Sequence, residues 1–154
     1  MFSDFQKYIP LLTEVLRKKQ RKEYAGLVLN LAAFKVMIKR ADLRLIGFFD
    51  MMANAIIPST RSAYNREEAK KKIVAICYIM AAQRNMFANE FVLNIGLFLD
   101  STGSTNESID AMHKIGVSVC AKTVDLHKTK IARNHKTSIK EFFQTNVIYC
   151  TLNT

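Results

Sequence analysis

Apolar side chains recur every three or four residues along most of this chain, and no segment alternates apolar with polar residues over a strand's length. The first spacing places one apolar stripe on an α-helix, whereas alternation is the pattern of a half-buried strand. Only two Pro and five Gly interrupt the 154 residues, so little breaks a helix. We therefore expect an all-α protein, a multi-helix bundle that ends in a helix-turn-helix-like hairpin.

The length predicts a single helical domain over residues 1–154, because a chain of this size can bury one hydrophobic core. If the domain has an internal hinge, it would lie near residues 58–65, where Pro58 precedes a cluster of small polar residues. The helix-turn-helix-like part would span residues 104–136. Residues 144–154 lose the helical pattern and are expected to form a loose tail.

Start and stop signals place the individual helices. The expected helices span residues 3–22, 23–40, 42–57, 65–85 and 89–100, followed by a pair on either side of Gly116. Asn65 and Ser104 are the expected N-caps of two of them, because each is followed three residues later by Glu in a capping-box pattern. Gly116 suits the left-handed residue just after a helix, and Ser118 is the expected cap of the final helix.

The charge is the strongest compositional signal, because 23 Lys and Arg against 13 Asp and Glu leave a net +10 and a pI near 9.7. Such a field attracts nucleic acid, anionic membrane surfaces and acidic proteins alike. The longest apolar stretch, residues 25–38, is shorter than the roughly 20 residues that span a bilayer, so no membrane segment is expected.

The hairpin supplies the residues that carry a candidate function. Its expected buried face consists of Ile109, Met112 and Ile115 on the first helix and Val119, Val124 and Ile131 on the second. The expected DNA-binding residues are Lys122, Thr123, His127, Lys128, Lys130, Arg133 and Lys136. Residues 120–140 hold six Lys or Arg and one acid, so this window carries +5, half of the net charge. In a helix-turn-helix such cations hold phosphates while neighbouring polar side chains reach base edges.

Two departures from the motif keep a second interpretation open. The connection is longer than the tight form, and Met112 stands where a small residue usually lets the helices approach. The alternative is an ordinary αα-hairpin with a solvated basic face. The two interpretations separate on geometry, because DNA binding needs Lys122, Lys128, Lys130 and Arg133 on one exposed, contiguous face.

A second basic segment, RKKQRK, closes the first expected helix. Its cations are Arg17, Lys18, Lys19, Arg21 and Lys22, and they would assist binding electrostatically or direct nuclear import. Three cysteines without a C-x-x-C pair fit a reducing compartment, and the N-terminus MFSDFQKYIP lacks the pattern of a signal peptide. An intracellular, and more narrowly nuclear, location is therefore expected.

No catalytic or cofactor site is expected. A metal-dependent nuclease would need clustered carboxylates, usually at strand ends, and Asp100, Asp110 and Asp125 have no strands to present them. Six or seven residues separate each neighbouring pair in the series His113, Cys120, His127 and His135, whereas structural zinc sites use closer ligand pairs. No glycine-rich phosphate loop is present, and Cys77 reads as a small core residue.

Residues 48–130 also carry a family resemblance. The segments FFDMMANAIIPSTRS and KKKIVAICYIMAAQRNMFANEFVLNIGLFLDSTGSTNESIDAMHKIGVSVCAKTV resemble a greatly expanded family of uncharacterised fungal proteins. Copies in that family often end in a Ser-x-x-x-Lys-Thr-Val hairpin, which corresponds here to Ser118–Val124. The family is similar to remnants of mobile elements, and the resemblance implies such an origin without assigning any functional residue.

Two functions from different classes remain. The first is a non-catalytic DNA-binding helical module, derived from a mobile element. The second is a helical protein–protein interaction or self-associating module, in which apolar faces meet a protein partner or a second copy and the charge serves solubility.

Overall fold

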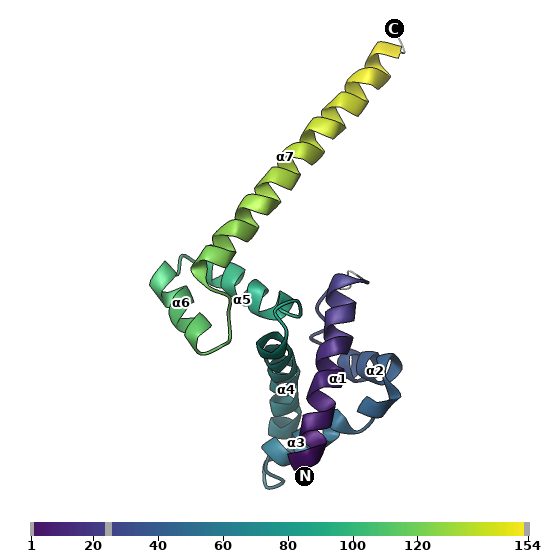
Figure 1. The fold of residues 1–154 in the computed structure, drawn as a ribbon, viewed down its shortest axis with the longest axis vertical. Coiled ribbons are helices and arrows are strands. Elements are labelled where there is room, and N and C mark those ends of the chain that lie inside the picture. Colours follow the sequence, from purple (N-terminus) through teal and green to yellow (C-terminus); the bar gives the residue numbers. More distant parts are fainter. Residues whose placement is uncertain (1, 24–25, 153–154) are drawn as a thin grey trace.

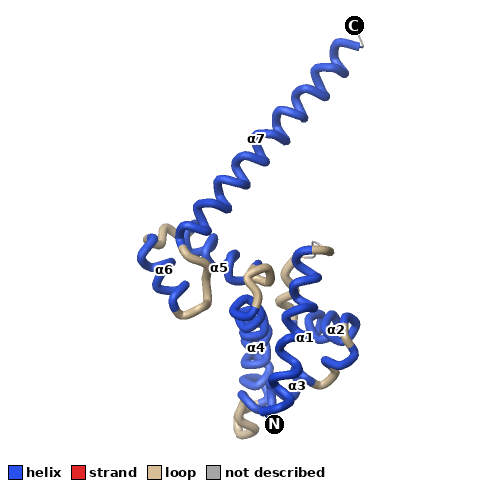
Figure 2. The backbone as a smooth tube through the Cα atoms, in the orientation of Figure 1, coloured by secondary structure: helices blue, strands red, loops and turns tan. Residues whose placement is uncertain are grey.

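The computed structural model describes residues 2–23 and 26–152, with side chains described for 5–23 and 26–139. Over these residues it contains helices and loops without any strand, which confirms the all-α prediction (Figure 2). The helices are α1 (Phe2–Arg21), α2 (Leu31–Ala41), the short 3-10 helix η1 (Leu43–Leu45), α3 (Phe48–Ile56), α4 (Ala63–Arg84), α5 (Glu90–Ser101), α6 (Asn106–Lys114) and α7 (Ala121–Leu152). Helices α1–α4 gather at one end, and α7 projects from the other (Figure 1).

The larger of two hydrophobic clusters holds α1–α4 together. Leu12, Phe34, Phe48 and Ile73, one from each helix, are 1% exposed or less. Buried aromatic and aliphatic side chains of this kind supply most of the favourable free energy of folding. The loop within 58–65, where a hinge was expected, joins α3 and α4, which both pack into this cluster. A hinge there stays a prediction.

The helix expected over residues 23–40 is wrong in its first part, because α2 begins only after Asn30. The Asn30 side chain accepts a hydrogen bond from the N–H of Ala33 (3.0 Å), which caps the helix at this point. Upstream, the Tyr78 hydroxyl accepts from the N–H of Val28 (3.1 Å) and donates to its carbonyl (3.4 Å). A tertiary contact therefore satisfies backbone groups that a helix would have paired internally.

The helix expected over residues 42–57 is also interrupted. Asp42 is extended, and its carboxylate accepts a hydrogen bond from the N–H of Arg44 (2.9 Å), which starts the short η1 turn instead. Gly47 then adopts φ +80°, a left-handed conformation that ends regular helix geometry. Helix α3 starts immediately after this glycine, at Phe48.

Two predicted N-caps are displaced by one to three residues. Helix α4 follows Ser62, whose hydroxyl accepts a hydrogen bond from the N–H of Asn65 (3.4 Å), so the predicted cap Asn65 lies inside the helix. Helix α6 follows Thr105, whose hydroxyl accepts from the N–H of Ser108 (3.2 Å), so Ser104 lies outside it. In both cases a nearby hydroxyl residue, three positions before the N–H that it caps, takes the place of the predicted residue.

A smaller cluster joins α5, α6 and the start of α7. Its buried members are Val92, Ile109, Val119, Ala121 and Val124. Phe91 packs against both clusters, and the Gln83 side chain donates a hydrogen bond to the carbonyl of Gly116 (3.2 Å). The chain therefore holds an α1–α4 unit and an α5–α7 unit that are packed against each other through α4 and α5.

Helix α7 runs much further than expected. The chain contains neither Gly nor Pro after residue 116, and the backbone remains helical to Leu152. The predicted loss of helical structure over residues 144–154 is therefore wrong as far as Leu152. The side chains of 140–152 and the last two residues lie outside the described part, so the anchoring of this segment stays a prediction.

Gly96 sets how closely α5 and α7 approach. A Cβ atom on this residue would lie 2.9 Å from Val124 Cγ2 and 3.0 Å from Val119 Cγ2, closer than such atoms normally pack. Valine side chains are stiff at χ1 and cannot easily turn away. We expect Gly96→Ala to destabilise the protein by about 1–2 kcal/mol, since overpacking exceeds the roughly 1 kcal/mol that Ala gains in a helix.

Chemical denaturation of Gly96→Ala checks this expectation. Gly26→Ala is the matched control, because no described atom lies within 4 Å of a Cβ built on Gly26 and its φ is not positive. The control should change the unfolding midpoint little. A Gly96→Ala variant more stable than the wild type would contradict the close α5–α7 packing.

Candidate nucleic-acid interface

Two carboxylates fix the start of α7 against the preceding helices. The Asp110 carboxylate, on α6, accepts a hydrogen bond from the N–H of Ala121, the first residue of α7 (2.9 Å). The Asp100 carboxylate, on α5, forms an ion pair with the Lys128 ammonium (2.8 Å), and this hydrogen bond raises the pKa of Lys128. An anionic group at a helix N-terminus also interacts favourably with the helix dipole. The first two turns of α7 are therefore held in a defined direction.

The connection between α6 and α7 matches the prediction only in part. Gly116 has φ +83°, and the N–H of Val117 bonds to the carbonyl of Met112 (3.2 Å), so the predicted glycine terminus is confirmed. Ser118 does not cap α7, because its hydroxyl is buried and donates to two backbone carbonyls. The six connecting residues, 115–120, exceed the three or four of a helix-turn-helix, which is therefore not confirmed.

Beyond its anchored start, α7 stands clear of the other helices (Figure 1). Every side chain from residue 128 to 139 is exposed. Arg133 lies about three helical turns after Lys122, and Lys136 about four turns after it, so the three cations lie along one side of the helix. Lys130 lies one turn before Arg133. We call these four exposed cations, Lys122, Lys130, Arg133 and Lys136, the basic face of α7.

The basic face forms no ion pair among the described residues, and its one acidic neighbour on the described part of α7 is the exposed Asp125, one turn after Lys122. None of its four cations forms an ion pair with a described acidic side chain, whereas most of the ion pairs between described residues lie in the α1–α4 part of the chain. From the first of these cations to the last, the face extends roughly 21 Å along the helix. An exposed, unpaired row of positive charge of this length can contact several phosphates of a polyanion at once.

Three of the predicted binding residues are half-buried or engaged within the fold and do not belong to this face. Thr123 is half-buried, and its hydroxyl lies 3.2 Å from the Cys120 thiol. His127 is half-buried and faces the cleft described below, and Lys128 is directed to α5 by its ion pair with Asp100. The cations expected on one contiguous face are therefore divided, with Lys128 apart from the others.

The expected buried side of the hairpin is confirmed for three residues and wrong for two. Ile109, Val119 and Val124 are buried, as predicted. Ile115 is 68% exposed and Ile131 is 52% exposed. Ile115 ends α6 at the turn, and Ile131 lies on the part of α7 where every side chain is exposed, so the apolar spacing continues there without a surface to pack against.

The second basic segment lies at the end of α1, and most of its cations form ion pairs or hydrogen bonds with other residues. Its five cations are Arg17, Lys18, Lys19, Arg21 and Lys22. Arg17 and Lys18 approach Glu14 at 2.6 and 4.0 Å, and Lys19 approaches Glu23 at 2.5 Å. Arg21 donates hydrogen bonds to the Phe87 carbonyl (3.0 Å) and to the Asn89 side chain (3.1 Å). This segment therefore holds α1 to the α4–α5 loop and offers fewer free charges than α7.

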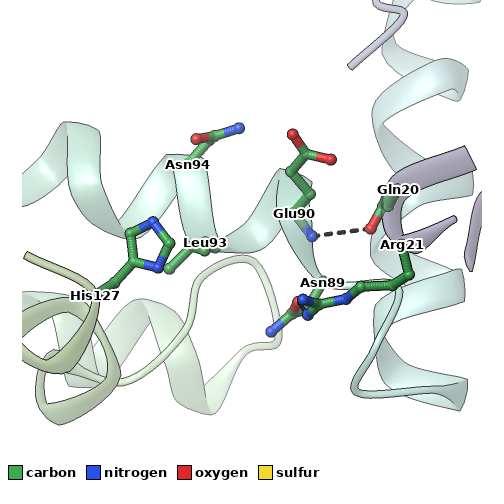
Figure 3. Close-up of a pocket in the computed structure, with 7 residues that line it drawn as sticks. All are labelled: Gln20, Arg21, Asn89, Glu90, Leu93, Asn94 and His127. Carbon is green, nitrogen blue, oxygen red and sulfur yellow. Dashed lines mark hydrogen bonds between the residues drawn. The ribbon is translucent and has the colours of Figure 1, made fainter. Parts of the chain in front are cut away.

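A polar cleft of about 240 Å³ lies between the end of α1, the start of α5 and α7 (Figure 3). It is lined by Gln20, Arg21, Asn89, Glu90, Leu93, Asn94 and His127. The Gln20 side-chain oxygen accepts a hydrogen bond from the N–H of Glu90 (3.2 Å), which joins α1 to α5. Burial raises the pKa of the Glu90 carboxyl, and the nearby Arg21 guanidinium partly opposes this. His127 enters the cleft from α7, beside Leu93 (Figure 3).

The residues considered for metal or catalytic chemistry are placed separately. Among the described side chains, no three His, Cys, Asp or Glu residues gather as a metal site would require. The His113 ring lies 3.1 Å from the Ser118 carbonyl, and Asp125 is exposed on α7. Burial raises the pKa of the Cys77 thiol to about 12, as suits a core residue. Each described helix is either too short or too polar to span a lipid bilayer.

The sequence reasoning missed the residues that orient the basic face. Asp100 and Asp110 were considered only as candidate metal ligands, yet they anchor α7. Their partners lie 28 and 11 residues away along the chain, so no local pattern marks these contacts. Comparison with protein-family models, with curated proteins and with solved structures gave no match.

Proposed function

We propose that this chain is a non-catalytic DNA-binding module whose contact surface is the basic face of α7. One observation carries the proposal: Lys122, Lys130, Arg133 and Lys136 lie exposed along one side of a helix that projects from the fold, without an acidic partner among the described residues. Phosphate contacts by such cations supply most of the affinity in nucleic-acid binding, because they release condensed counterions.

The distribution of charge supports this choice of surface. In α1–α4 the cations commonly sit beside acids, for example Lys35 with Asp50 (2.6 Å) and Lys70 with Glu67 (2.6 Å). Exposed ion pairs of this kind contribute little stability and offer little free charge to a ligand. On α7 the four cations of the basic face have no described acidic partner, and a groove or backbone of DNA could approach them without meeting the rest of the fold.

Replacing the basic face tests the proposal. A variant with Lys122, Lys130, Arg133 and Lys136 changed to Gln should largely lose binding to a short DNA duplex at low salt, measured by fluorescence anisotropy. The matched control changes four paired cations of α1–α4, Lys35, Arg44, Lys70 and Lys71, to Gln, which removes the same formal charge. Its affinity should stay within about threefold of the wild type, because screening limits the effect of distant charges. Equal losses in both variants would overturn the choice of α7 as the surface.

The proposal includes a nuclear location and an origin in a mobile element, both of which rest on sequence. The basic run RKKQRK at residues 17–22 fits a loose import signal, and residues 48–130 carry the resemblance to mobile-element remnants. Microscopy of the fluorescently tagged chain in a eukaryotic cell, with Lys18, Lys19 and Lys22 changed to Gln in the comparison, tests the import signal. An unchanged distribution would overturn it.

A second candidate function is a helical interaction module, and an exposed apolar surface favours it. Val36, Leu43 and Ile46 are 46%, 72% and 55% exposed, and two of them, Val36 and Ile46, line a shallow groove between α2, η1 and α3. Exposed apolar groups clustered in this way are typical of contact surfaces. Sedimentation at increasing protein concentration would detect self-association, and changing Leu43 and Ile46 to Ser should abolish it.

A further inference from the structure

The exposed part of α7 has few side chains free to recognise bases. The hydroxyl of Thr129 donates a hydrogen bond to the Asp125 carbonyl (2.9 Å), and that of Thr137 donates to the Arg133 carbonyl (3.1 Å). Ser138 is engaged in the same way, with a carbonyl four residues earlier (3.0 Å). These hydroxyl hydrogens are committed to the helix's own backbone, so they are not available as donors to base edges.

The groups that remain differ in what they can recognise. The ammonium groups of Lys122, Lys130 and Lys136 are compact point charges that suit phosphate oxygens. Arg133 is the one member of the basic face whose planar fork could pair with a guanine edge. Asn134 follows it in the chain and therefore lies about 100° further around the helix, at the margin of the face.

The same segment lacks a platform for unpaired bases. Residues 121–139, the part of α7 whose side chains are described, contain no Phe, Tyr or Trp. Proteins that bind single strands combine a positive groove with aromatic side chains on which successive bases stack. A basic helix whose described side chains include no Phe, Tyr or Trp instead matches the width of the major groove of a duplex, which admits an α-helix.

We propose that the basic face of α7 binds duplex DNA through its phosphates and does not select a base sequence. This inference rests on the proposed function, since it describes how the same face makes its contact. The four cations position the helix on the phosphate backbones of the two DNA strands. The hydroxyl groups that donate to the helix's own carbonyls cannot donate to bases, so they do not select a base sequence. The ligand is therefore any DNA duplex long enough to cover the face of roughly 21 Å.

The test compares several DNA probes at one low salt concentration. Three duplexes of equal length, one A·T-rich, one G·C-rich and one mixed, are titrated with the full chain, alongside the single strand of the mixed duplex. We expect the three duplex dissociation constants to agree within about threefold, because even one bidentate base contact would exceed this spread. The single strand should bind at least about fivefold more weakly, because it lacks the second backbone and the stacking that would replace it.

Arg133 provides the sharpest pair of variants. Arg133→Lys keeps the charge but removes the planar fork, so its affinity should stay within about twofold on every duplex. Arg133→Gln removes the charge and should weaken all three duplexes by the same factor, with the log–log salt dependence reduced by about 0.9. A loss in Arg133→Lys confined to the G·C-rich duplex would show base recognition and overturn the inference.

The remaining outcomes separate the two proposals. If no probe binds at low salt, DNA binding itself is wrong, and this inference is wrong with it. If the chain binds DNA but prefers one duplex by about tenfold or more, or prefers the single strand, then the proposed function stands while sequence-independent duplex binding is overturned.

Discussion

Raising the salt concentration from about 50 to about 200 mM is expected to weaken binding of this chain to a short DNA duplex by roughly 150-fold. Four cations on the basic face of α7 contact phosphates in the proposed complex. Each neutralised phosphate contributes about −0.9 to the log–log slope of affinity against salt, so four contacts give a slope near −3.6. A fourfold increase in salt then lowers the association constant by roughly two powers of ten.

The slope also tells whether the charges act at α7 or through the general field of the protein. The variant with all four cations of the basic face changed to Gln should show a slope weaker than about −1. The control variant of Lys35, Arg44, Lys70 and Lys71 should keep a slope close to that of the wild type, although its net charge is the same. Anisotropy titrations at four salt concentrations give both slopes. Similar slopes for the two variants would mean that binding follows net charge alone, which would contradict a contact localised on α7.

Much of the fold could be predicted because local signals in the chain agree with its tertiary packing. The apolar spacing placed α1, α4, α5 and α6 to within a few residues, and the left-handed conformation of Gly116 was predicted from its position. Some wrong predictions had local causes, such as the Asp42 cap and Gly47, but one was decided by a contact distant in sequence. The break before α2 depends on Tyr78, which lies 50 residues from its partner Val28. A pattern of about ten to twenty neighbouring residues, on which helix prediction depends, cannot contain both of these residues.

The candidate site was predictable in composition but not in geometry. The sequence places six Lys or Arg between residues 120 and 140, and four of them form the basic face. Which side of α7 each cation occupies depends on where α5 lies. Asp100 on α5 draws Lys128 to that side, and the cleft at the start of α5 receives His127. Ile131 was expected to be buried because it continues the spacing of Val124, but the surface of α5 does not extend that far.

Ile109→Ala is expected to have the largest effect on stability, about 2–5 kcal/mol lost from the free energy of unfolding of the α5–α7 unit. Ile109 is 1% exposed and is the largest of the five buried residues in the smaller cluster. Truncating it removes apolar burial and leaves a cavity, and so small a cluster has few other contacts to compensate. The buried residues of the larger cluster, among them Phe34, Phe48 and Ile73, make separate contacts and should keep theirs.

The structure therefore predicts uneven unfolding, which hydrogen exchange can resolve along the chain. In Ile109→Ala, amides in α5, α6 and the start of α7 should lose protection at low denaturant, while amides of α4 near Ile73 keep theirs. Ile115→Ala is the matched control, since it removes the same atoms from a side chain that is 68% exposed, and its cost should stay within about 0.5 kcal/mol. Because α7 takes its direction from this unit, Ile109→Ala should also weaken DNA binding without removing any charge. Equal loss of protection in both units would instead mean that the two clusters unfold as one.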